Sequence, residues 1–347
     1  MSVYNGEEYL SKSIDSILKQ SFTNFEFIII NDGSNDNSEE IIKSYCDPRI
    51  IYISNEANLG LISSLNKGLA LARGKYIARQ DADDISLRNR IEKQVKHLEE
   101  NSETAVVGSH IRYIDEKQNH IGSLEYPVTR NSNKWQLFFN STICHSAALY
   151  RKSLALKLGG YSKEYKYAED YELWSRISRC SGIENLSDTL QLYRIHNGAI
   201  SSKRHQQQLE VRRRIANENI KYFLEEKGNL EEYSALLPGS YVTSANLART
   251  YLQSLISLQS IFCQSVSLCE TDKQFIEQWI LSDILRLRKN LNLKNSIQFL
   301  VENHDCLPKL VWRKSNLLKF LLSDSLINAL KTILGKSSTK GNRRLKS

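Results

Sequence analysis

The first hundred residues alternate between apolar runs and apolar stripes at helical spacing. Phe25–Ile30 is a near-continuous apolar run, typical of a strand buried on both faces, and Ile50–Ile53 and Tyr76–Ala78 are shorter runs of the same kind. Between these runs lie two helical stripes, formed by Leu10, Ile14, Ile17 and Leu18 and by Ile62, Leu65, Leu69 and Ala72. Strand–helix–strand units of this length predict an α/β fold with a Rossmann-like, mostly parallel, doubly wound sheet.

The first strand predicted for this sheet is short. Ser2–Gly6 has the composition of a strand end, but a buried parallel strand normally has several apolar residues before that point. Two interpretations stay open: either residues ahead of Met1 belong to the strand, or the strand is unusually short.

The pattern changes twice further along the chain. From Thr104 it is mixed, with strands expected at Ala105–Gly108, Ser146–Tyr150 and Leu190–Arg194 and a helix at Tyr167–Cys180. After about residue 202 the strand signals end, and apolar residues recur at helical spacing. We therefore predict an α/β domain at 1–202, a helical C-terminal region at 203–335 and a basic disordered tail at 336–347.

The net charge of +8 is unevenly distributed. Residues 1–202 carry 24 Lys and Arg against 26 Asp and Glu, whereas residues 203–347 carry 23 against 13. From residue 306 onward the ratio is 10 to 1. A basic C-terminal end suits an anionic surface, and either a peripheral membrane helix or a core-packing helix with a solvated basic side fits residues 309–334. No recognition motif supports nucleic-acid binding.

The densest polar stretch is Gln80-Asp81-Ala82-Asp83-Asp84, directly after the apolar run at Tyr76–Ala78. Carboxylates packed this closely repel one another, and a cation or a metal–polyphosphate complex relieves the repulsion. Ligands of doubly wound sheets bind at the carboxyl ends of the strands. We therefore expect a divalent ion, Mn²⁺ or Mg²⁺, at this strand end.

Three other polar loops follow predicted strands, at Tyr4–Glu7, Asn31–Ser34 and Asn55–Gly60. Each of them alone is consistent with an ordinary turn, since Asp-Gly and Asn-Leu-Gly are good turn sequences. Their repetition at successive strand ends indicates one shared site.

Several separated motifs resemble those of the family 2 glycosyltransferases with the GT-A fold, of the bacterial surface-polysaccharide type. They are VYNGEEYL, FEFIIINDGSNDNS, NEANLGLISSLNKGLALARGKYIARQDADD and AEDYELWSRI, and together they cover roughly residues 1–200 in order. The resemblance implies that the domain at 1–202 is the nucleotide-sugar-binding and catalytic domain, and the C-terminal helical region lies outside it.

The resemblance implies roles for residues on the donor side. Tyr4 and Glu7 align with a loop around the base and ribose, Asp32 with an aspartate that binds a uracil-type base, and Arg73 with a basic position near the nucleotide. Asp81 and Asp83 are the two acids of the DXD motif. By this resemblance Asp83 binds Mn²⁺ or Mg²⁺, and Asp81 reaches the ribose or donor sugar.

Four further residues keep a structural alternative. Asp84 is expected near the donor sugar, or else as the cap of a helix that begins near Ser86. Asp170 is the catalytic base that the resemblance implies, with Glu169 beside it on the acceptor side, although both fit the first turn of a helix by charge alone. His196 is a metal or phosphate contact or a surface-loop histidine, and His145 lines the acceptor side or has a structural role.

The resemblance implies an inverting, metal-dependent glycosyltransferase that uses a nucleotide-sugar donor, most simply UDP-linked. Its acceptor would be a growing cell-surface glycan, such as lipopolysaccharide, O-antigen or capsule on a lipid carrier. We expect a cytoplasmic protein without nucleic-acid partners, and peripheral contact with the anionic inner face of the membrane is one reading of its basic end. Alternatives are a non-catalytic nucleotide-sugar-binding module or another nucleotide-sugar-processing transferase.

Overall fold

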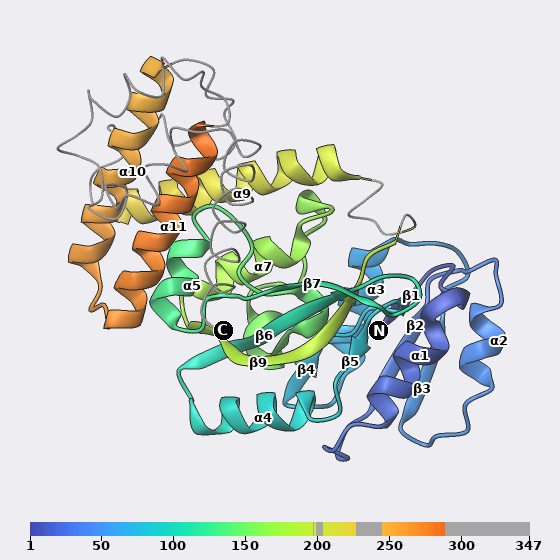
Figure 1. The fold of residues 1–347 in the computed structure, drawn as a ribbon. Helices are drawn as coiled ribbons and strands as arrows, with labels where there is room; N and C mark the ends of the chain where they lie inside the picture. Colours follow the sequence, from blue (N-terminus) through green and yellow to red (C-terminus); the bar gives the residue numbers. More distant parts are fainter. Residues whose placement is uncertain (197, 199–203, 227–244, 289–347) are drawn as a thin grey trace, which may run out of the picture. The chain divides into compact units, whose positions relative to one another are not determined.

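The computed structural model describes residues 1–196, 198, 204–226 and 245–288. The chain divides into two units, residues 1–226 and residues 227–347, and each unit is described by itself. The first unit contains all the sheet structure of the described residues and every candidate site residue named above (Figure 1).

The first sheet is parallel and has the order β1-β2-β3 (Ser2–Val3, Phe27–Asn31 and Ile50–Ser54). In β2, Phe27, Ile29 and Ile30 are buried. This confirms the parallel arrangement that the apolar runs predict for the start of the chain.

Three helices follow the strands of this part: α1 (Glu7–Leu18), α2 (Ser38–Lys43) and α3 (Leu61–Leu71). The α1 stripe of Leu10, Ile14 and Ile17 is buried with Val3, Phe27 and Ile29 in one apolar cluster, as its spacing predicts. Gly60, which precedes α3, has a φ of 87°, a conformation that glycine adopts without a Cβ clash.

The second sheet is mixed. Its order is β4-β8-β6-β9-β5 (Tyr76–Ala78, Leu149–Arg151, Thr104–Ile114, Gly182–Arg194 and Ile85–Ser86), with β7 (His120–Leu124) paired to β6. β6 and β9 run parallel, and the other pairs are antiparallel. The α/β fold is thus confirmed, with its parallel strands concentrated in the first sheet and at the β6–β9 pair.

Helices cover the second sheet and share an extended apolar cluster with it. They are α4 (Arg90–Glu100), α5 (Arg130–Gln136), α6 (Lys152–Lys157) and α7 (Glu169–Ser178), with 3₁₀ turns at His145–Ala147 and Lys163–Tyr165. Tyr171, Trp174 and Ile177 of α7 are fully buried with Val106 and Tyr150 of the sheet. This packing fixes the start of α7, where Glu169 and Asp170 lie.

The helix α9 (His205–Glu226) belongs to the first unit. Asn219 Nδ2 donates to Leu137 O at 2.7 Å and to Ser175 Oγ at 2.8 Å, so α9 is tied to α7 by a buried amide. The helical region predicted from residue 203 therefore opens with a helix that packs within the first unit.

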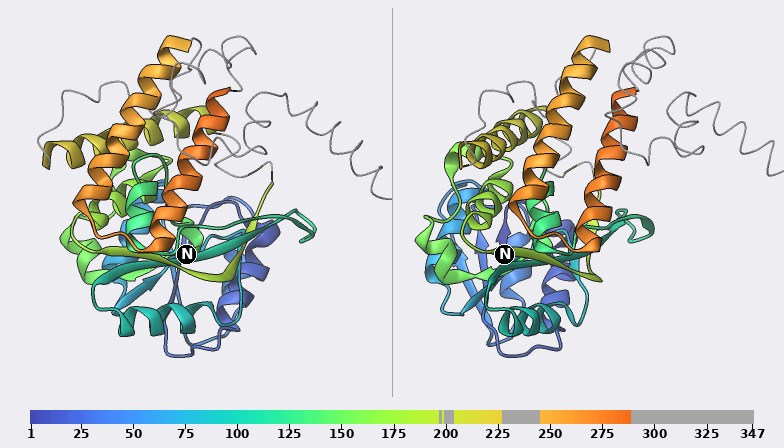
Figure 2. Two further views of the ribbon diagram at one scale, coloured as in Figure 1. Left: turned by 60° about the vertical axis from the view of Figure 1, so that its left-hand side comes forward. Right: turned by 90° about the vertical axis from the view of Figure 1, so that its left-hand side faces the viewer.

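In the second unit, α10 (Ala245–Ser265) and α11 (Glu270–Arg288) run side by side (Figure 2). Tyr251 Oη donates to Asp283 Oδ2 at 2.6 Å between them. No helix of the described residues is long and apolar enough to span a membrane. The basic segment 309–334 and the tail 336–347 lie outside the described residues.

Candidate active site

The loops after β1 and β2 are hydrogen-bonded to each other. Asn5 N donates to Ser34 Oγ at 3.0 Å, and Asn35 N donates to Asn5 Oδ1 at 2.8 Å. Glu7 Oε2 accepts from both the backbone N–H and the side-chain amide of Asn37, at 2.9 and 2.6 Å. Glu7 therefore holds this pair of loops together, and Tyr4 beside it has a side chain that is about half exposed.

Asp32 follows β2 and is buried. Its Oδ1 accepts from Asn55 Nδ2 at 2.7 Å and from Leu59 N at 3.0 Å, and its Oδ2 accepts from Gly60 N at 2.9 Å. A carboxylate offers about four acceptor positions, and these bonds use three of them. Asp32 thus organises the loop before α3 and retains one acceptor position for a ligand.

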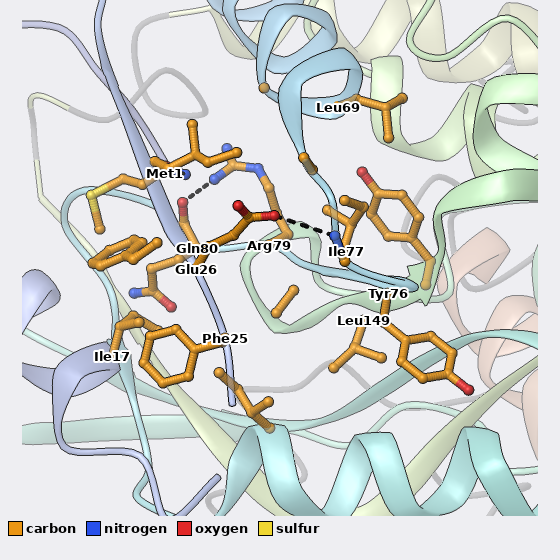
Figure 3. A pocket seen from close by; sticks show the side chains of 18 of the residues that line it. Met1, Ile17, Phe25, Glu26, Leu69, Tyr76, Ile77, Arg79, Gln80 and Leu149 are labelled. Carbon is orange, nitrogen blue, oxygen red and sulfur yellow. Dashed lines mark hydrogen bonds between the residues drawn. The ribbon is translucent and has the colours of Figure 1, made fainter. Parts of the chain in front are cut away.

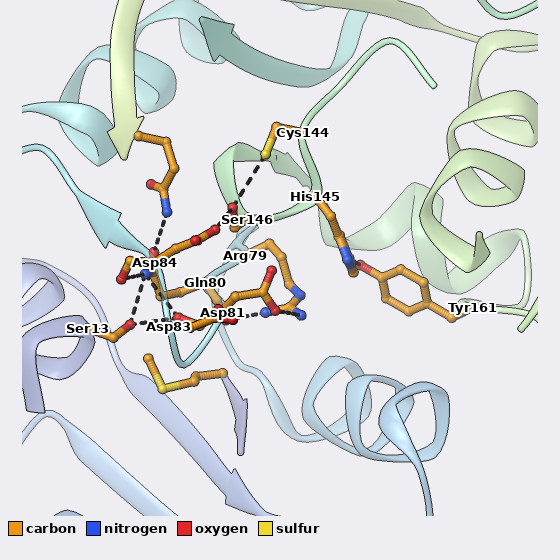
Figure 4. Close-up of polar contacts among 12 residues, drawn as sticks. Ser13, Arg79, Gln80, Asp81, Asp83, Asp84, Cys144, His145, Ser146 and Tyr161 are labelled. Carbon is orange, nitrogen blue, oxygen red and sulfur yellow. Dashed lines mark hydrogen bonds and ion pairs between the residues drawn. The ribbon is translucent and has the colours of Figure 1, made fainter. Parts of the chain in front are cut away.

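The acidic loop after β4 is held through its main chain. The carbonyl of Asp81 accepts from Ser13 Oγ at 2.6 Å, and Gln80 Nε2 donates to that carbonyl and to Asp84 O at 3.2 and 2.9 Å. Arg194 Nε donates to Asp83 O at 2.8 Å, and Arg79 donates to Gln80 O. These bonds fix the loop while leaving the side chains of Asp81 and Asp83 half-buried (Figure 4).

Asp81 is paired with a buried cation. Arg79 Nη2 lies 2.5 Å from Asp81 Oδ1, and the Arg79 side chain is only 3% exposed. Burial opposes ionisation of Asp81, but the guanidinium outweighs it and lowers the pKa of the carboxyl. Asp81 is therefore a charged carboxylate whose orientation is set by Arg79.

The Asp83 carboxylate is paired with His196, which follows β9. Asp83 Oδ2 lies 3.0 Å from His196 Nε2, and the two side chains are 33% and 14% exposed. The His196 ring packs edge-on against the Tyr9 ring, with 5.0 Å between the ring centroids. The Arg194 guanidinium carbon lies 4.4 Å from the centroid of the same Tyr9 ring. The structure thus brings together the two residues predicted to face the metal.

Asp84 has a different role from both predictions made for it. It is 1% exposed, its Oδ1 accepts from Arg194 N at 2.8 Å, and its Oδ2 accepts from Ser146 Oγ. Ser86, where a capped helix was expected, lies in β5, and α4 begins only at Arg90. Burial, followed by the nearby charges of Asp83 and Asp81, raises its pKa well above the usual range. Asp84 is a structural junction inside the protein, neither a helix cap nor a residue open to the donor sugar.

Glu169 and Asp170 begin α7, whose first turn they share with Glu172. Burial and then the neighbouring Asp170 raise the pKa of Glu169 to about 7. Burial also raises the pKa of Asp170, and the charge of Asp81 adds to this effect, whereas the Tyr171 backbone N–H and Arg212 oppose it. Of the effects named here, that of Asp81 is the smallest.

His145 takes part in a chain of side-chain hydrogen bonds with two tyrosines. Its Nε2 is 3.0 Å from Tyr161 Oη, which is 3.1 Å from Tyr150 Oη. Burial, followed by the charge of Arg79, lowers the pKa of His145 to about 3, so the ring is neutral near pH 7. The structure thus gives the His145 side chain a hydrogen bond to Tyr161 (Figure 4).

Arg73 is the one predicted donor-side residue that the structure does not bring to these loops. Its Nε lies 2.8 Å from Glu26 Oε2, and its side chain is 80% exposed. Both residues precede the strands β2 and β4, whereas the acidic loop and Asp32 follow them. We leave Arg73 out of the candidate site.

The sequence of this chain is similar to those of known proteins. The family model described as Glycosyl transferase family 2 matches residues 1–159. An uncharacterized glycosyltransferase of Haemophilus influenzae is 40% identical over 242 residues, which are 65% of this chain and 73% of that protein. The chain belongs to glycosyltransferase family 2. It is accordingly a glycosyltransferase, and the family resemblance of its motifs is confirmed.

Two other relatives of this family 2 glycosyltransferase come from Escherichia coli. The O-antigen biosynthesis glycosyltransferase WbnJ is 38% identical over 57% of this chain and 78% of its own length. The UDP-Glc:alpha-D-GlcNAc-diphosphoundecaprenol beta-1,3-glucosyltransferase WfgD is 31% identical over 59% of this chain and 79% of its own length.

A solved structure shows the same fold at low sequence identity. The mannosyltransferase PcManGT from Pyrobaculum calidifontis, in complex with GDP-Man and Mn²⁺, superposes with a TM-score of 0.52. The match covers 87% of this chain and 85% of that one at 15% identity, so it bears on the GT-A fold alone.

A divalent cation fits the donor side of this glycosyltransferase. Within the described ranges, no group of three or more His, Cys, Asp or Glu is placed to hold a metal ion. Mg²⁺-type sites commonly use one or two protein carboxylates and complete their shell with substrate phosphates and water. The half-buried Asp83 with His196 is compatible with such an incomplete set, which phosphate and water oxygens would have to complete.

The sequence did not reveal the buried arginines that organise this site. Arg79, Arg90 and Arg194 are 3%, 0% and 1% exposed, and Arg90 donates to Arg79 O at 2.9 Å and also to Ser146 O. For Arg79 and Arg194, the signal in the sequence was a charged residue that directly follows or ends an apolar strand. Such a residue is rarely buried without a specific partner.

Proposed function

We propose that this enzyme transfers a sugar from a UDP-sugar to a hydroxyl of a growing cell-surface glycan, with inversion and with a divalent cation. The observation that carries the proposal is the division of carboxylates. Asp81 and Asp83 lie together in the loop after β4, and Asp170 lies separately at the start of α7.

Asp83 and His196 would hold Mn²⁺ or Mg²⁺ against the donor diphosphate. When bound, such an ion supplies positive charge that stabilises the departing nucleoside diphosphate. Asp81, oriented by Arg79, would accept hydrogen bonds from ribose or donor-sugar hydroxyls. Tyr4, Glu7 and Asp32 would contact the nucleoside, because they line the adjoining loops after β1 and β2.

Asp170 would be the general base for the acceptor hydroxyl. A raised pKa makes an ionised carboxylate a better proton acceptor, provided that it remains ionised at the working pH. One base, separate from the groups that face the leaving group, fits a direct displacement in which the acceptor oxygen forms its bond as the diphosphate leaves. Glu169 and His145 would then shape the acceptor side.

The donor and acceptor classes rest on the relatives. WfgD of E. coli is named for a UDP-Glc donor and a diphosphoundecaprenol-linked acceptor, and WbnJ for O-antigen biosynthesis. A UDP-sugar and a lipid-linked glycan are therefore the first substrates to test. Work at the cytoplasmic face of the membrane belongs to the same proposal.

Hydrolysis of nucleotide sugars tests the proposal. We expect release of UDP from at least one of a panel of UDP-sugars with Mn²⁺, loss of this release with EDTA, and its return with excess Mn²⁺. Asp83→Asn should lower the metal-dependent rate about 100-fold, because removal of one group that stabilises charge in a transition state commonly has an effect of this size. Ser123→Ala, in the strand β7, is the matched control. Turnover that EDTA leaves unchanged would refute the metal dependence, and turnover only with GDP- or dTDP-sugars would refute the donor.

A further inference from the structure

Tyr167, which lies two residues before Glu169, has an unusual backbone conformation. Its φ is 78°, in the left-handed region that a residue with a bulky side chain rarely adopts. Of the other non-glycine residues that the structure describes, only Asn5 and Gln118 have a positive φ. Such a conformation costs free energy, persists only where the surrounding structure holds it, and is frequent at functional sites. The contacts that hold Tyr167 therefore bear on the acidic pair that follows it.

The helix α9 makes a hydrogen bond to the backbone of Tyr167. Gln208 Nε2 donates to Tyr167 O at 2.9 Å, although the two residues are 41 positions apart in the chain. Ala168, the next residue, is the N-cap of α7 and gives the helix no side-chain hydrogen bond. The start of α7 is thus bonded to α9 at a point where it lacks a side-chain cap of its own.

The same helix also holds the 3₁₀ turn that precedes Tyr167. Tyr165 Oη donates to Glu218 Oε2 at 2.9 Å, and the Arg214 guanidinium carbon lies 4.4 Å from the centroid of the Tyr165 ring. α7 and α9 are in contact within the first unit (Figure 1). Because Trp174, further along α7, is fixed in the apolar cluster, the start of this helix lies between that cluster and α9.

A positive charge comes from the same side of α9. Arg212 follows Gln208 by four residues, a spacing that places both side chains on one side of the helix. Arg212 lowers the pKa of Asp170, an effect that follows burial and the Tyr171 backbone N–H in size. Arg212 Nη2 also donates to Asn140 Oδ1, which restrains its guanidinium. One side of α9 therefore acts on the start of α7 by a hydrogen bond and by a charge.

We propose that Gln208 is a positioning residue for Asp170: through the Tyr167 carbonyl it holds the start of α7 where the Asp170 carboxylate can reach an acceptor hydroxyl. This inference rests on the proposed role of Asp170 as the general base. It assigns a part in the reaction to α9, which lies beyond residues 1–159 of the family match. A misplacement of about 1 Å can lower a catalytic rate about 100-fold, so a bond that sets the position of the base affects the reaction.

Amide hydrogen exchange tests the positioning without any substrate. Ala168 N donates to Tyr165 O at 3.0 Å and Glu172 N donates to Ala168 O at 3.1 Å, so these two amides report on the helix start. In Gln208→Ala we expect both amides to exchange at least about tenfold faster, because Tyr167 can then leave its left-handed conformation. Gln207→Ala, the same change at an exposed neighbour, is the matched control and should leave both amides unchanged.

Kinetics test the effect on the reaction, with the nucleotide sugar that the parent enzyme hydrolyses fastest with Mn²⁺ and with water in place of the acceptor. Gln208→Ala should lower kcat about 10- to 100-fold and leave KM within about twofold, because Gln208 does not contact the donor loops. In a Tyr167→Gly background the same change should lower kcat less than about threefold, since glycine adopts a positive φ without a steric cost.

Glu26→Ala is the control for a loss of stability alone. Glu26 lines a cavity of about 700 Å³ (Figure 3) and accepts from the backbone N–H groups of Arg73 and Gly74 at 2.6 and 3.2 Å. This variant also loses side-chain bonds to the backbone, but away from α7, so kcat should stay within about twofold of the parent value.

Unchanged exchange at Ala168 and Glu172 in Gln208→Ala would overturn the proposal, whatever the enzyme does with nucleotide sugars. Faster exchange with an unchanged kcat, or an equal loss of kcat in the Tyr167→Gly background, would also overturn it, and the proposed function would stand. A parent enzyme that hydrolyses no nucleotide sugar would instead refute the proposed function, and the role of Gln208 in the reaction with it.

Discussion

The acidic loop after β4 and the acidic pair at the start of α7 both concentrate carboxylates, but their surroundings are opposite. In the loop, the Arg79 guanidinium lowers the pKa of Asp81 against the effect of burial, and His196 faces Asp83. At α7, burial raises the pKa values of both Glu169 and Asp170. The loop therefore keeps the Asp81 carboxylate charged, whereas the α7 pair favours the uptake of a proton.

This difference matches the two tasks of a sugar transfer. Permanent negative charge suits the binding of a cation and a diphosphate, whereas a raised pKa suits a group that must take a proton from a hydroxyl. Pairs of carboxylates with separated pKa values are how one site performs both tasks near neutral pH. Substitutions that change the electrostatic surroundings of either region test this comparison.

The largest effect is expected at the α7 pair. Asp170→Asn removes the proton acceptor and should lower kcat of transfer about 10²–10⁴-fold, with UDP binding unchanged. Glu169→Gln, one residue away, is the control and should stay within about tenfold of the parent enzyme. Rate assays with calorimetric titration of UDP measure both. If Glu169→Gln were the more damaging change, the base would be Glu169.

Arg79→Met should raise the pKa of the Asp81 carboxyl, as burial does for the carboxyls of the α7 pair. The change leaves Asp81 without its paired guanidinium and Gln80 O without a buried donor, and it should lower the free energy of unfolding by about 3 kcal/mol. The pKa of Asp81 should rise at the same time, which moves the acid limb of the pH–rate profile upward. Urea unfolding and pH–rate measurements test the two effects.

Arg112→Met is the control for Arg79→Met, because Arg112 is an exposed residue of β6. Equal stability of the two variants would show that the Arg79–Asp81 pair is not a structural element of the loop.

The smallest of these effects is a pH dependence of stability from Glu169. Its folded pKa of about 7 exceeds the usual 4.5, so the native state binds a proton that the unfolded state releases between these values. The free energy of unfolding should therefore fall as pH rises from about 4.5 to 7, by roughly 3 kcal/mol at most. Glu169→Gln should flatten this part of the curve in urea unfolding at pH 5, 6, 7 and 8. Parallel curves for the two proteins would contradict the assignment.

Much of the fold and part of the site could be predicted from local sequence. The apolar run of β2, the helical stripe of α1 and the acidic loop after Tyr76–Ala78 all depend on neighbouring residues, and the structure confirms their elements. The Glu169–Asp170 pair was found at a helix start for the same reason.

The misplaced residues depend on distant partners. Asp84 is buried because Ser146 and Arg194, which are 62 and 110 residues away, bond to it. Arg73 precedes β4, at the opposite end of that strand from the acidic loop, and there it pairs with Glu26, which is 47 residues away. Spacing along the chain carries no information on such contacts, so the acidic cluster could be located but not divided into open and buried carboxylates.

The junction at Asp84 has a consequence for the order of folding. The loop after β4 is fixed by Arg194, and Asp83 meets a histidine 113 residues later in the chain. Contacts of such large sequence separation form late, because the intervening chain must first lose its freedom. During synthesis the contacts of Asp83 with Arg194 and His196 therefore cannot form until residue 196 has left the ribosome. A chain stopped before β9 would have its acidic loop without the contacts that fix it.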